Sequence, residues 1–275
     1  MKWSEAAERA VSRTPFLVRK RIRKSVEDEA LRQGAQTVHV DHVESCRQRM
    51  FGQMETEIQG YRVEACFGFS GCPNHAFGDH DDVSEVEREL KERDLKGFLK
   101  TRVRGPLKFH HEFRVSISAC PNACSQPQIV DFGLIGARLP KVTTVNCDGC
   151  GACVAICREG AVSLEGDSGS HPRIDNGRCL ACGQCINVCP SEALVEAAKG
   201  FRILLGGKLG RHPQLGRELP GSFAPQVSLC ILKASLDFYL RHNIGGERFG
   251  EVLLRVGADL LADLLPESTK TIGLI

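Results

Sequence analysis

Residues 113–124 read Phe-Arg-Val-Ser-Ile-Ser-Ala-Cys-Pro-Asn-Ala-Cys, and the rest of the sequence is organised around them. The first six residues of this stretch alternate apolar and polar side chains. A period of two predicts a strand with one buried face. The second half predicts a loop in which Cys120 and Cys124 flank the pair Pro121-Asn122. The stretch therefore predicts a strand that delivers two thiols to one loop.

A second cysteine loop lies upstream, where Cys66 and Cys72 flank a glycine-rich segment and Cys-Pro-Asn recurs from Cys72. A proline after a cysteine contributes no N–H and fixes φ, so we expect both loops to be rigid. The N–H groups that follow can then point at a cluster sulfur. Four thiolates in two rigid loops, Cys66, Cys72, Cys120 and Cys124, predict one [4Fe-4S] cluster. The alternative is four buried free cysteines.

The spacing Cys-x5-Cys followed by Cys-x3-Cys resembles the sirohaem-[4Fe-4S] motif of sulfite and nitrite reductases. The resemblance continues through residues 128–137, where Asp-Phe-Gly-Leu-Ile-Gly (131–136) looks like the strand after the second cysteine pair. It implies that Cys124, the last cysteine of the motif, bridges the cluster to the sirohaem iron and is the catalytic cysteine. Spacing alone indicates only a cluster, and the sirohaem comes from the resemblance.

Composition limits the functional classes. A chain of 275 residues can bury a core and hold more than one domain. Lys and Arg number 36 against 34 Asp and Glu, so no strong field favours nucleic acid or a membrane surface. No apolar run is long enough for a signal peptide or a membrane span. We therefore expect a cytoplasmic protein in which 12 of the 14 cysteines bind metal, with Cys46 and Cys230 left over as buried thiols.

Residues 1–52 are expected to form a small helical unit. Apolar residues at i+4 steps from Val18 to Ala30 predict a helix with one apolar stripe. Asp41 and Glu44 form a candidate capping box for a further helix that ends near Met50. Basic residues crowd positions 19–24, either as a solvated face or as a site for carboxylates or phosphate. Residues 3–43 resemble the C-terminal domain of light-independent protochlorophyllide reductase subunits, which in that family lies near a tetrapyrrole.

The strongest motif is a pair of cysteine runs, each spaced Cys-x2-Cys-x2-Cys-x3-Cys, the second of which is followed by Pro190. It resembles a bacterial two-[4Fe-4S] ferredoxin, which implies that the fourth cysteine of each run binds the other cluster. Zinc is the alternative for any Cys-x2-Cys pair, but the third and fourth cysteines favour cubane clusters. The implied ligands are Cys147, Cys150, Cys153 and Cys189 for one cluster, and Cys179, Cys182, Cys185 and Cys157 for the other.

After this motif, residues 201–205 predict an apolar strand and residues 206–213 a glycine-rich basic turn. Lys208, Arg211 and His212 offer positive charge to the many carboxylates of sirohaem. The stretch resembles the Leu-Gly-Gly segment of anaerobic sulfite reductases, and the alternative is a strand and turn with solvated bases. Further helices are expected at 83–97, 227–240 and 247–265.

These observations predict an α+β redox protein with a sirohaem-[4Fe-4S] core interrupted by a ferredoxin insertion. The expected cofactors are three [4Fe-4S] clusters and sirohaem. An electron-donor protein would reduce the ferredoxin clusters, and a small inorganic oxyanion, sulfite first and nitrite second, would be the substrate. The expected domains are residues 1–52, 53–141, 142–195 and 196–275.

One departure from the family pattern concerns the missing half of the core. Family enzymes build the sirohaem pocket from two similar halves, whereas only about a dozen residues separate the helical unit from Cys66. We therefore expect a homo-oligomer or a second reductase subunit to supply that half. The alternatives are a haem-free electron-transfer subunit with three clusters and a tetrapyrrole-handling protein.

Overall fold

The computed structural model describes residues 1–166 and 171–257, which form two compact units. The first unit comprises residues 1–59 and 104–110, and the second comprises residues 60–103 and the described residues from 111 onward. Mixed helices and strands confirm the predicted α+β class. The first unit contains β1 (Lys2–Trp3), α1 (Glu5–Ser12), α2 (Phe16–Arg32), β2 (Thr37–Val38) and α3 (Val40–Glu57).

The first unit packs its three helices around small apolar side chains. Strands β1 and β2 pair in parallel, and Trp3 closes one edge of the core. The indole Nε1 of Trp3 donates to Glu27 Oε1 at 2.8 Å, while the guanidinium of Arg23 lies 4.2 Å from the ring centroid. The buried side chains at the centre are Ala7, Val26, Ala30, Val38 and Cys46.

Three sequence expectations for this unit differ from the structure in detail. The capping box of α3 is formed by His39 and His42 instead of Asp41 and Glu44, because His42 Nδ1 accepts the His39 N–H at 2.9 Å. The helix also runs past Met50 to Glu57. The apolar stripe of α2 is buried only from Val26 onward.

The second unit is built on a five-stranded sheet in the order β3-β4-β5-β8-β9. Strands β3, β4 and β5 are parallel, and β8 and β9 are antiparallel to their neighbours. The strands are β3 (Tyr61–Ala65), β4 (Phe113–Ser118), β5 (Phe132–Val142), β8 (Leu194–Leu205) and β9 (Arg217–Glu218). Three 3-10 turns, Phe67–Ser70, Phe109–His111 and Pro127–Ile129, lie in the connections.

Strand β4 is buried on both faces, not on one as its alternating pattern predicts. Phe113 and Ile117 face the apolar core, yet Ser116 and Ser118 are fully buried as well. The two hydroxyls are satisfied by the loop that follows the strand: Ser116 Oγ donates to Ser125 O at 2.6 Å, and Ser118 Oγ lies 2.7 Å from Ser125 Oγ. A polar face can be buried here because the cysteine loop supplies its hydrogen bonds.

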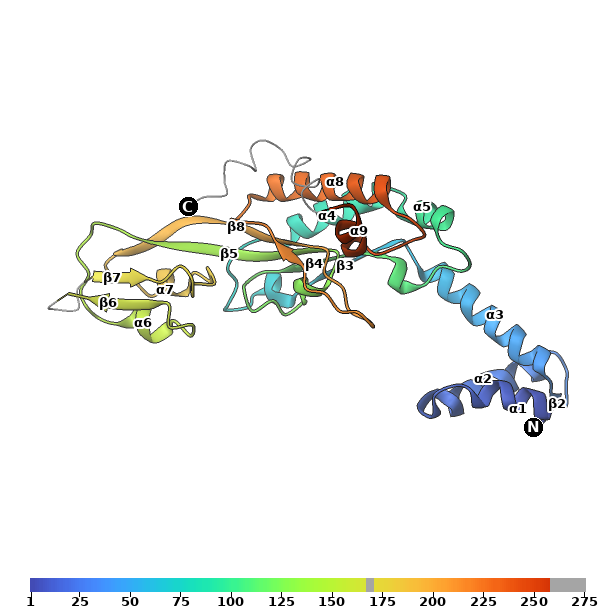
Figure 1. Cartoon of the computed structure of the whole chain (residues 1–275). Helices are drawn as coiled ribbons and strands as arrows, with labels where there is room; N and C mark the ends of the chain where they lie inside the picture. Colours follow the sequence, from blue (N-terminus) through green and yellow to red (C-terminus); the bar gives the residue numbers. More distant parts are fainter. Residues whose placement is uncertain (167–170, 258–275) are drawn as a thin grey trace. The chain divides into compact units, whose positions relative to one another are not determined.

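The apolar side chains of this sheet pack against helices (Figure 1). These helices are α4 (His80–Glu92), α5 (Leu95–Arg102), α8 (Pro225–His242) and α9 (Phe249–Val256). The single helix expected at 83–97 is two helices, because Asp94 adopts a left-handed conformation (φ 41°) and caps α5 through Gly97 N–H. The helix expected at 247–265 is described to Val256, and residues 258–265 lie outside the described part. No described helix is long and apolar enough to cross a membrane.

The two four-cysteine runs are carried on a long antiparallel ribbon of β5 and β8 (Figure 1). Pairing extends from Phe132 with Leu205 to Val142 with Leu194 and is interrupted by a bulge at Leu139/Pro140. The inserted segment is joined to the ribbon by Arg138 N–H, which donates to Ala181 O at 2.7 Å. The segment contains α6 (Ala152–Ile156), β6 (Val162–Glu165), β7 (His171–Ile174) and α7 (Gln184–Asn187).

Candidate metal centres

The core cysteines gather where two neighbouring parallel strands end. Cys66 directly follows β3, and Cys120 follows β4 after a single alanine. The two strand ends are joined because Cys66 N–H donates to Ile117 O at 3.0 Å. Parallel strands bring their carboxyl ends to one edge of a sheet, where ligands commonly bind. The topology therefore places both cysteine loops at the same edge.

The sulfur of Cys66 accepts two backbone hydrogen bonds. Gly68 N–H donates to it at 3.3 Å and Ala119 N–H at 3.2 Å. A Cβ at Gly68 would lie 2.9 Å from this sulfur and 2.8 Å from the Ala119 Cβ, so only glycine fits there. Backbone N–H groups directed at a sulfur stabilise its thiolate form. The loop thus directs two backbone donors at the sulfur of Cys66.

The four core thiols share one neighbourhood. Burial raises the pKa of Cys120, and the nearby thiols of Cys66, Cys124 and Cys72 raise it further, against a backbone hydrogen bond that lowers it. Thiols that oppose one another's ionisation in this way need a cationic partner to become thiolates. Irons of a cluster would supply that charge, so the residues present fit a [4Fe-4S] group.

Cys124 differs from the other core cysteines because it is exposed. Its sulfur accepts a hydrogen bond of 2.9 Å from the side-chain amide of Asn122. The intervening Ala123 has a left-handed φ of 53°, which turns the chain sharply between the two residues. The thiol predicted to bridge two cofactors is therefore held in place and open to its surroundings.

The ferredoxin segment brings its cysteines together in two crossed sets. Burial raises the pKa of Cys153, and the thiols of Cys147 and Cys189 act in the same direction. Burial likewise raises the pKa of Cys185 to about 11, with contributions from the thiols of Cys182, Cys179 and Cys157. Cys147 and Cys153 of the first run thus lie near Cys189 of the second, and Cys179, Cys182 and Cys185 of the second run lie near Cys157 of the first. The full ligand assignment that the ferredoxin resemblance implies stays a prediction.

Backbone donors also reach the ferredoxin cysteines. Leu194 N–H donates to Cys189 Sγ at 3.4 Å, and together with Ser191 and Ala193 it outweighs burial and lowers the pKa of Cys189. Similar N–H contacts of 3.3–3.4 Å reach Cys147, Cys157 and Cys179. Among the described residues, no three His, Cys, Asp or Glu side chains converge as ligands of one ion. A [4Fe-4S] cluster does not require such convergence on one ion, because each thiolate binds a different iron, whereas zinc is a single ion.

A cavity of about 220 Å³ is lined by Cys120 of the core and by one of the ferredoxin sets. Its core side is formed by Asn74, Cys120, Pro121 and Asn122. Its other side includes all four cysteines of one set: Cys157, Cys179, Cys182 and Cys185. The second set, which contains Cys147, is absent from the residues that line it. One predicted cluster site therefore faces the core site.

The basic turn predicted to bind sirohaem is fastened to α9. Lys208 Nζ pairs with Glu251 Oε1 at 2.5 Å, and only 12% of the Lys208 side chain is exposed. Burial alone would raise the pKa of Glu251, but hydrogen bonds from Lys208 and from Arg248 N–H outweigh it and lower this pKa. Arg211 and His212 are exposed on the loop closed by the backbone hydrogen bonds between Lys208 and Gln214.

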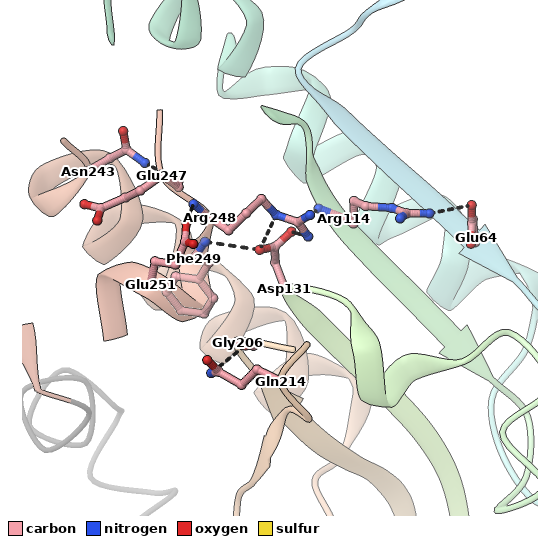
Figure 2. A network of polar contacts seen from close by, with 10 residues as sticks. All are labelled: Glu64, Arg114, Asp131, Gly206, Gln214, Asn243, Glu247, Arg248, Phe249 and Glu251. Carbon is pink, nitrogen blue, oxygen red and sulfur yellow. Dashed lines mark hydrogen bonds and ion pairs between the residues drawn. The ribbon is translucent and has the colours of Figure 1, made fainter. Parts of the chain in front are cut away.

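A buried ion pair beneath this turn is a feature that the sequence patterns do not predict (Figure 2). Asp131 is fully buried, and Arg248 donates to its two oxygens at 3.1 and 2.5 Å. The backbone N–H groups of Arg114 and Phe249 complete its hydrogen bonds at 2.8 and 3.2 Å. Asp131 thus joins β4, β5 and the start of α9. The partners are 117 residues apart, so local periodicity has no signal for them.

The remaining sequence expectations concern surface groups. Cys46 is buried as expected, but Cys230 is exposed on α8, so the expectation of a second buried thiol is wrong.

The basic residues at 19–24 differ in whether they have partners in the chain. Arg19 donates to the carbonyls of Ser12 and Thr14, and Arg23 pairs with Glu8, while Lys20, Arg21 and Lys24 are exposed.

Two family models match the chain. Residues 63–271 match the nitrite and sulphite reductase 4Fe-4S domain, and residues 3–47 match the proto-chlorophyllide reductase 57 kD subunit. Together they cover both units of the structure. The first match includes every cysteine of the three sets.

Named relatives are similar to different lengths of the chain. Coenzyme F420-dependent sulfite reductase of Methanocaldococcus jannaschii is 38% identical over 207 residues, which are 75% of this chain and 31% of that protein. One subunit of the anaerobic sulfite reductase of Salmonella typhimurium is 30% identical over 105 residues, 38% of this chain and 26% of that protein. The chain therefore spans a third or less of these relatives. A crystal structure of dissimilatory sulfite reductase I shares the fold, with a TM-score of 0.51 and 21% identity over 74% of this chain and 51% of that one.

Proposed function

Because the chain belongs to the nitrite and sulphite reductase 4Fe-4S domain family, we propose that it reduces sulfite as an iron–sulfur and sirohaem-binding reductase subunit. The observation that carries the proposal is the gathering of Cys66, Cys72, Cys120 and Cys124 at the ends of β3 and β4. Sirohaem, when bound, would supply the iron chemistry that reduces a small inorganic oxyanion. Nitrite is the second candidate substrate.

Within this function, Cys124 would bind iron on the cluster side and reach the sirohaem on the other. Its exposure supports this role, since a bridging sulfur must contact a group outside the cysteine loop. Asn122 would hold the sulfur by its 2.9 Å hydrogen bond and reduce the negative charge on it. The four core cysteines would therefore both carry the cluster and present it to the cofactor.

The ferredoxin cysteines would bring electrons from a protein donor. Their two crossed sets support two further [4Fe-4S] clusters, which makes three in the chain. The cavity shared by Cys120 with Cys157, Cys179, Cys182 and Cys185 supports direct transfer from the ferredoxin segment to the core. The donor protein would bind at the surface of the ferredoxin segment.

Lys208 is the mostly buried basic side chain of the turn, and we propose that its ammonium binds a sirohaem carboxylate beside Glu251. We expect Lys208→Met to weaken sirohaem binding about tenfold, since one charge-assisted hydrogen bond to a carboxylate contributes about 1.5–3 kcal/mol. Binding is measured by titrating sirohaem into the protein and following its absorption. Lys199→Met is the matched control, because Lys199 is exposed and pairs with Glu196 at 3.6 Å on the ribbon. Equal affinities for the two variants would contradict the role of Lys208.

A second subunit or a second copy of this chain would complete the sirohaem site. The chain spans a third or less of its sulfite reductase relatives, and the family pocket uses two halves. The anaerobic sulfite reductase relative is itself named as a subunit. This supports assembly with another reductase half.

A haem-free electron-transfer subunit with three clusters is the second candidate function. The Lys208–Glu251 ion pair favours it, because this basic side chain already has a partner within the chain. Arg211 and His212 are exposed, as solvated bases would be. The two functions share the same cluster sites and differ only in the haem.

Iron content and colour distinguish the two candidates. Anaerobically reconstituted protein is expected to hold about 12 irons per chain in three clusters, with matching acid-labile sulfide, and one more iron when sirohaem is bound. Sirohaem adds Soret and red absorption bands that clusters lack. Three clusters without these bands after sirohaem addition would favour the electron-transfer function. An iron content of about eight per chain would show that the core cysteines bind no cluster, while the ferredoxin sites do.

A further inference from the structure

The side-chain amide of Gln184 is buried without a hydrogen-bond partner. Four buried side-chain atoms in the described part of the chain lack a partner, and Nε2 of Gln184 is one of them. The other three belong to Arg19, Glu29 and Arg49, whose charged groups form hydrogen bonds or ion pairs. An unpaired buried donor costs about 1–3 kcal/mol, so such a group calls for an explanation.

The surroundings of Gln184 are thiols. Gln184 lines the 220 Å³ cavity together with Cys120 of the core and Cys157, Cys179, Cys182 and Cys185 of the facing ferredoxin set. It is also the first residue of α7, directly after Gly183, whose left-handed φ of 73° turns the chain into the helix. Gln184 therefore lines the same cavity as the four thiols that would hold this cluster.

The two ferredoxin runs differ at this position. Gln184 stands between Gly183 and Cys185, and the equivalent residue of the first run is Ala152, between Gly151 and Cys153. Ala152 is absent from the cavity lining and has no side-chain donor. The chain thus provides one amide donor for the site that faces the core and none at the equivalent place in the other.

We propose that Gln184 donates a hydrogen bond to a sulfur of the cluster held by Cys157, Cys179, Cys182 and Cys185. Hydrogen bonds to cluster sulfurs raise the reduction potential, because they stabilise the additional negative charge of the reduced form. Gln184 is therefore a positioning residue that raises the reduction potential of this site. The inference rests on the cluster sites of the proposed function.

This assignment gives the electron path a direction. One electron from a low-potential protein donor enters at the site of Cys147, Cys150, Cys153 and Cys189. It passes to the site beside Gln184, so the first site is oxidised and the second reduced, with no bond or proton exchanged. From there the cavity leads to Cys120 and the core site.

The test is a redox titration of the full reconstituted chain, with dithionite as reductant and cluster signals followed by electron paramagnetic resonance. Gln184→Ala is expected to lower one cluster potential by a tenfold change in its reduction equilibrium, ~59 mV for one electron. The affected signal should be the one that disappears in Cys182→Ser. Gln184→Glu, which keeps the shape but removes the donor, should lower the same potential.

Gln226→Ala is the matched control, because Gln226 is a glutamine outside this cavity and should leave all potentials unchanged. Unchanged potentials in Gln184→Ala with about 12 irons bound would overturn the role of Gln184 alone. The role of Gln184 is also overturned if Cys182→Ser removes a signal other than the one that Gln184→Ala shifts. The same holds if Gln184→Ala shifts the potentials of all clusters equally. A protein that binds no cluster at these cysteines would overturn both this inference and the proposed function.

Discussion

Replacing Cys124 by serine is expected to abolish sulfite reduction and to uncouple the core cluster from the sirohaem. The loss should exceed the about 10–100-fold that outer partners of metal ligands contribute, because Cys124 is itself the proposed bridging ligand. Serine offers a harder oxygen that does not match a thiolate as an iron ligand in this site. The measurements are sulfite-dependent turnover and the magnetic coupling between cluster and haem iron.

Cys230→Ser is the matched control for this prediction, since Cys230 is an exposed thiol outside all three cysteine sets. It should leave turnover and coupling unchanged. Cys179→Ser should spare the haem spectrum and slow only electron delivery. If Cys124→Ser retains both activity and coupling, the bridging assignment is wrong.

Replacing Asp131 by alanine is expected to destabilise the second unit by about 3–5 kcal/mol. Removing one partner of a buried ion pair leaves the other charge without compensation, and here Arg248 would lose both of its carboxylate contacts. The N–H groups of Arg114 and Phe249 would also lose their acceptor (Figure 2). The quantity to measure is the free energy of unfolding in urea, followed by far-ultraviolet circular dichroism.

Asp237→Ala is the control for this substitution, because Asp237 pairs with Arg93 at the surface and its side chain is 55% exposed. Such a pair contributes about 0–1 kcal/mol. Fluorescence of Trp3, the only tryptophan, reports separately on the first unit, which does not contain Asp131. A loss for Asp131→Ala no larger than that for Asp237→Ala would show that the buried pair is not the anchor of α9.

The sequence alone identified the family and predicted the cysteine sets. Both resemblances, to sulfite and nitrite reductases and to the protochlorophyllide reductase domain, are confirmed by the family models. This was possible because ligand spacing and glycine positions are local, so they can be read within about ten residues. The alternation of residues 113–118 likewise predicted β4, and apolar spacing predicted the helices that became α2, α4 and α8.

Only the tertiary structure decided what surrounds each of these elements. Ser116 and Ser118 are polar and buried, because Ser125 of the following loop satisfies them. The sequence offered Lys208 as a ligand of a cofactor carboxylate, and the structure gives it Glu251, 43 residues away.

The same limit applies to the buried groups that the sequence patterns left without a role. Asp131 meets Arg248 across 117 residues, and Gln184 and Cys120 come to line one cavity only through the fold of the β5–β8 ribbon. Which distant side chains neutralise, cap or shield one another depends on how strands and helices pack. Spacing along the chain determined which thiols could bind iron, whereas packing determined which charges and donors would surround them.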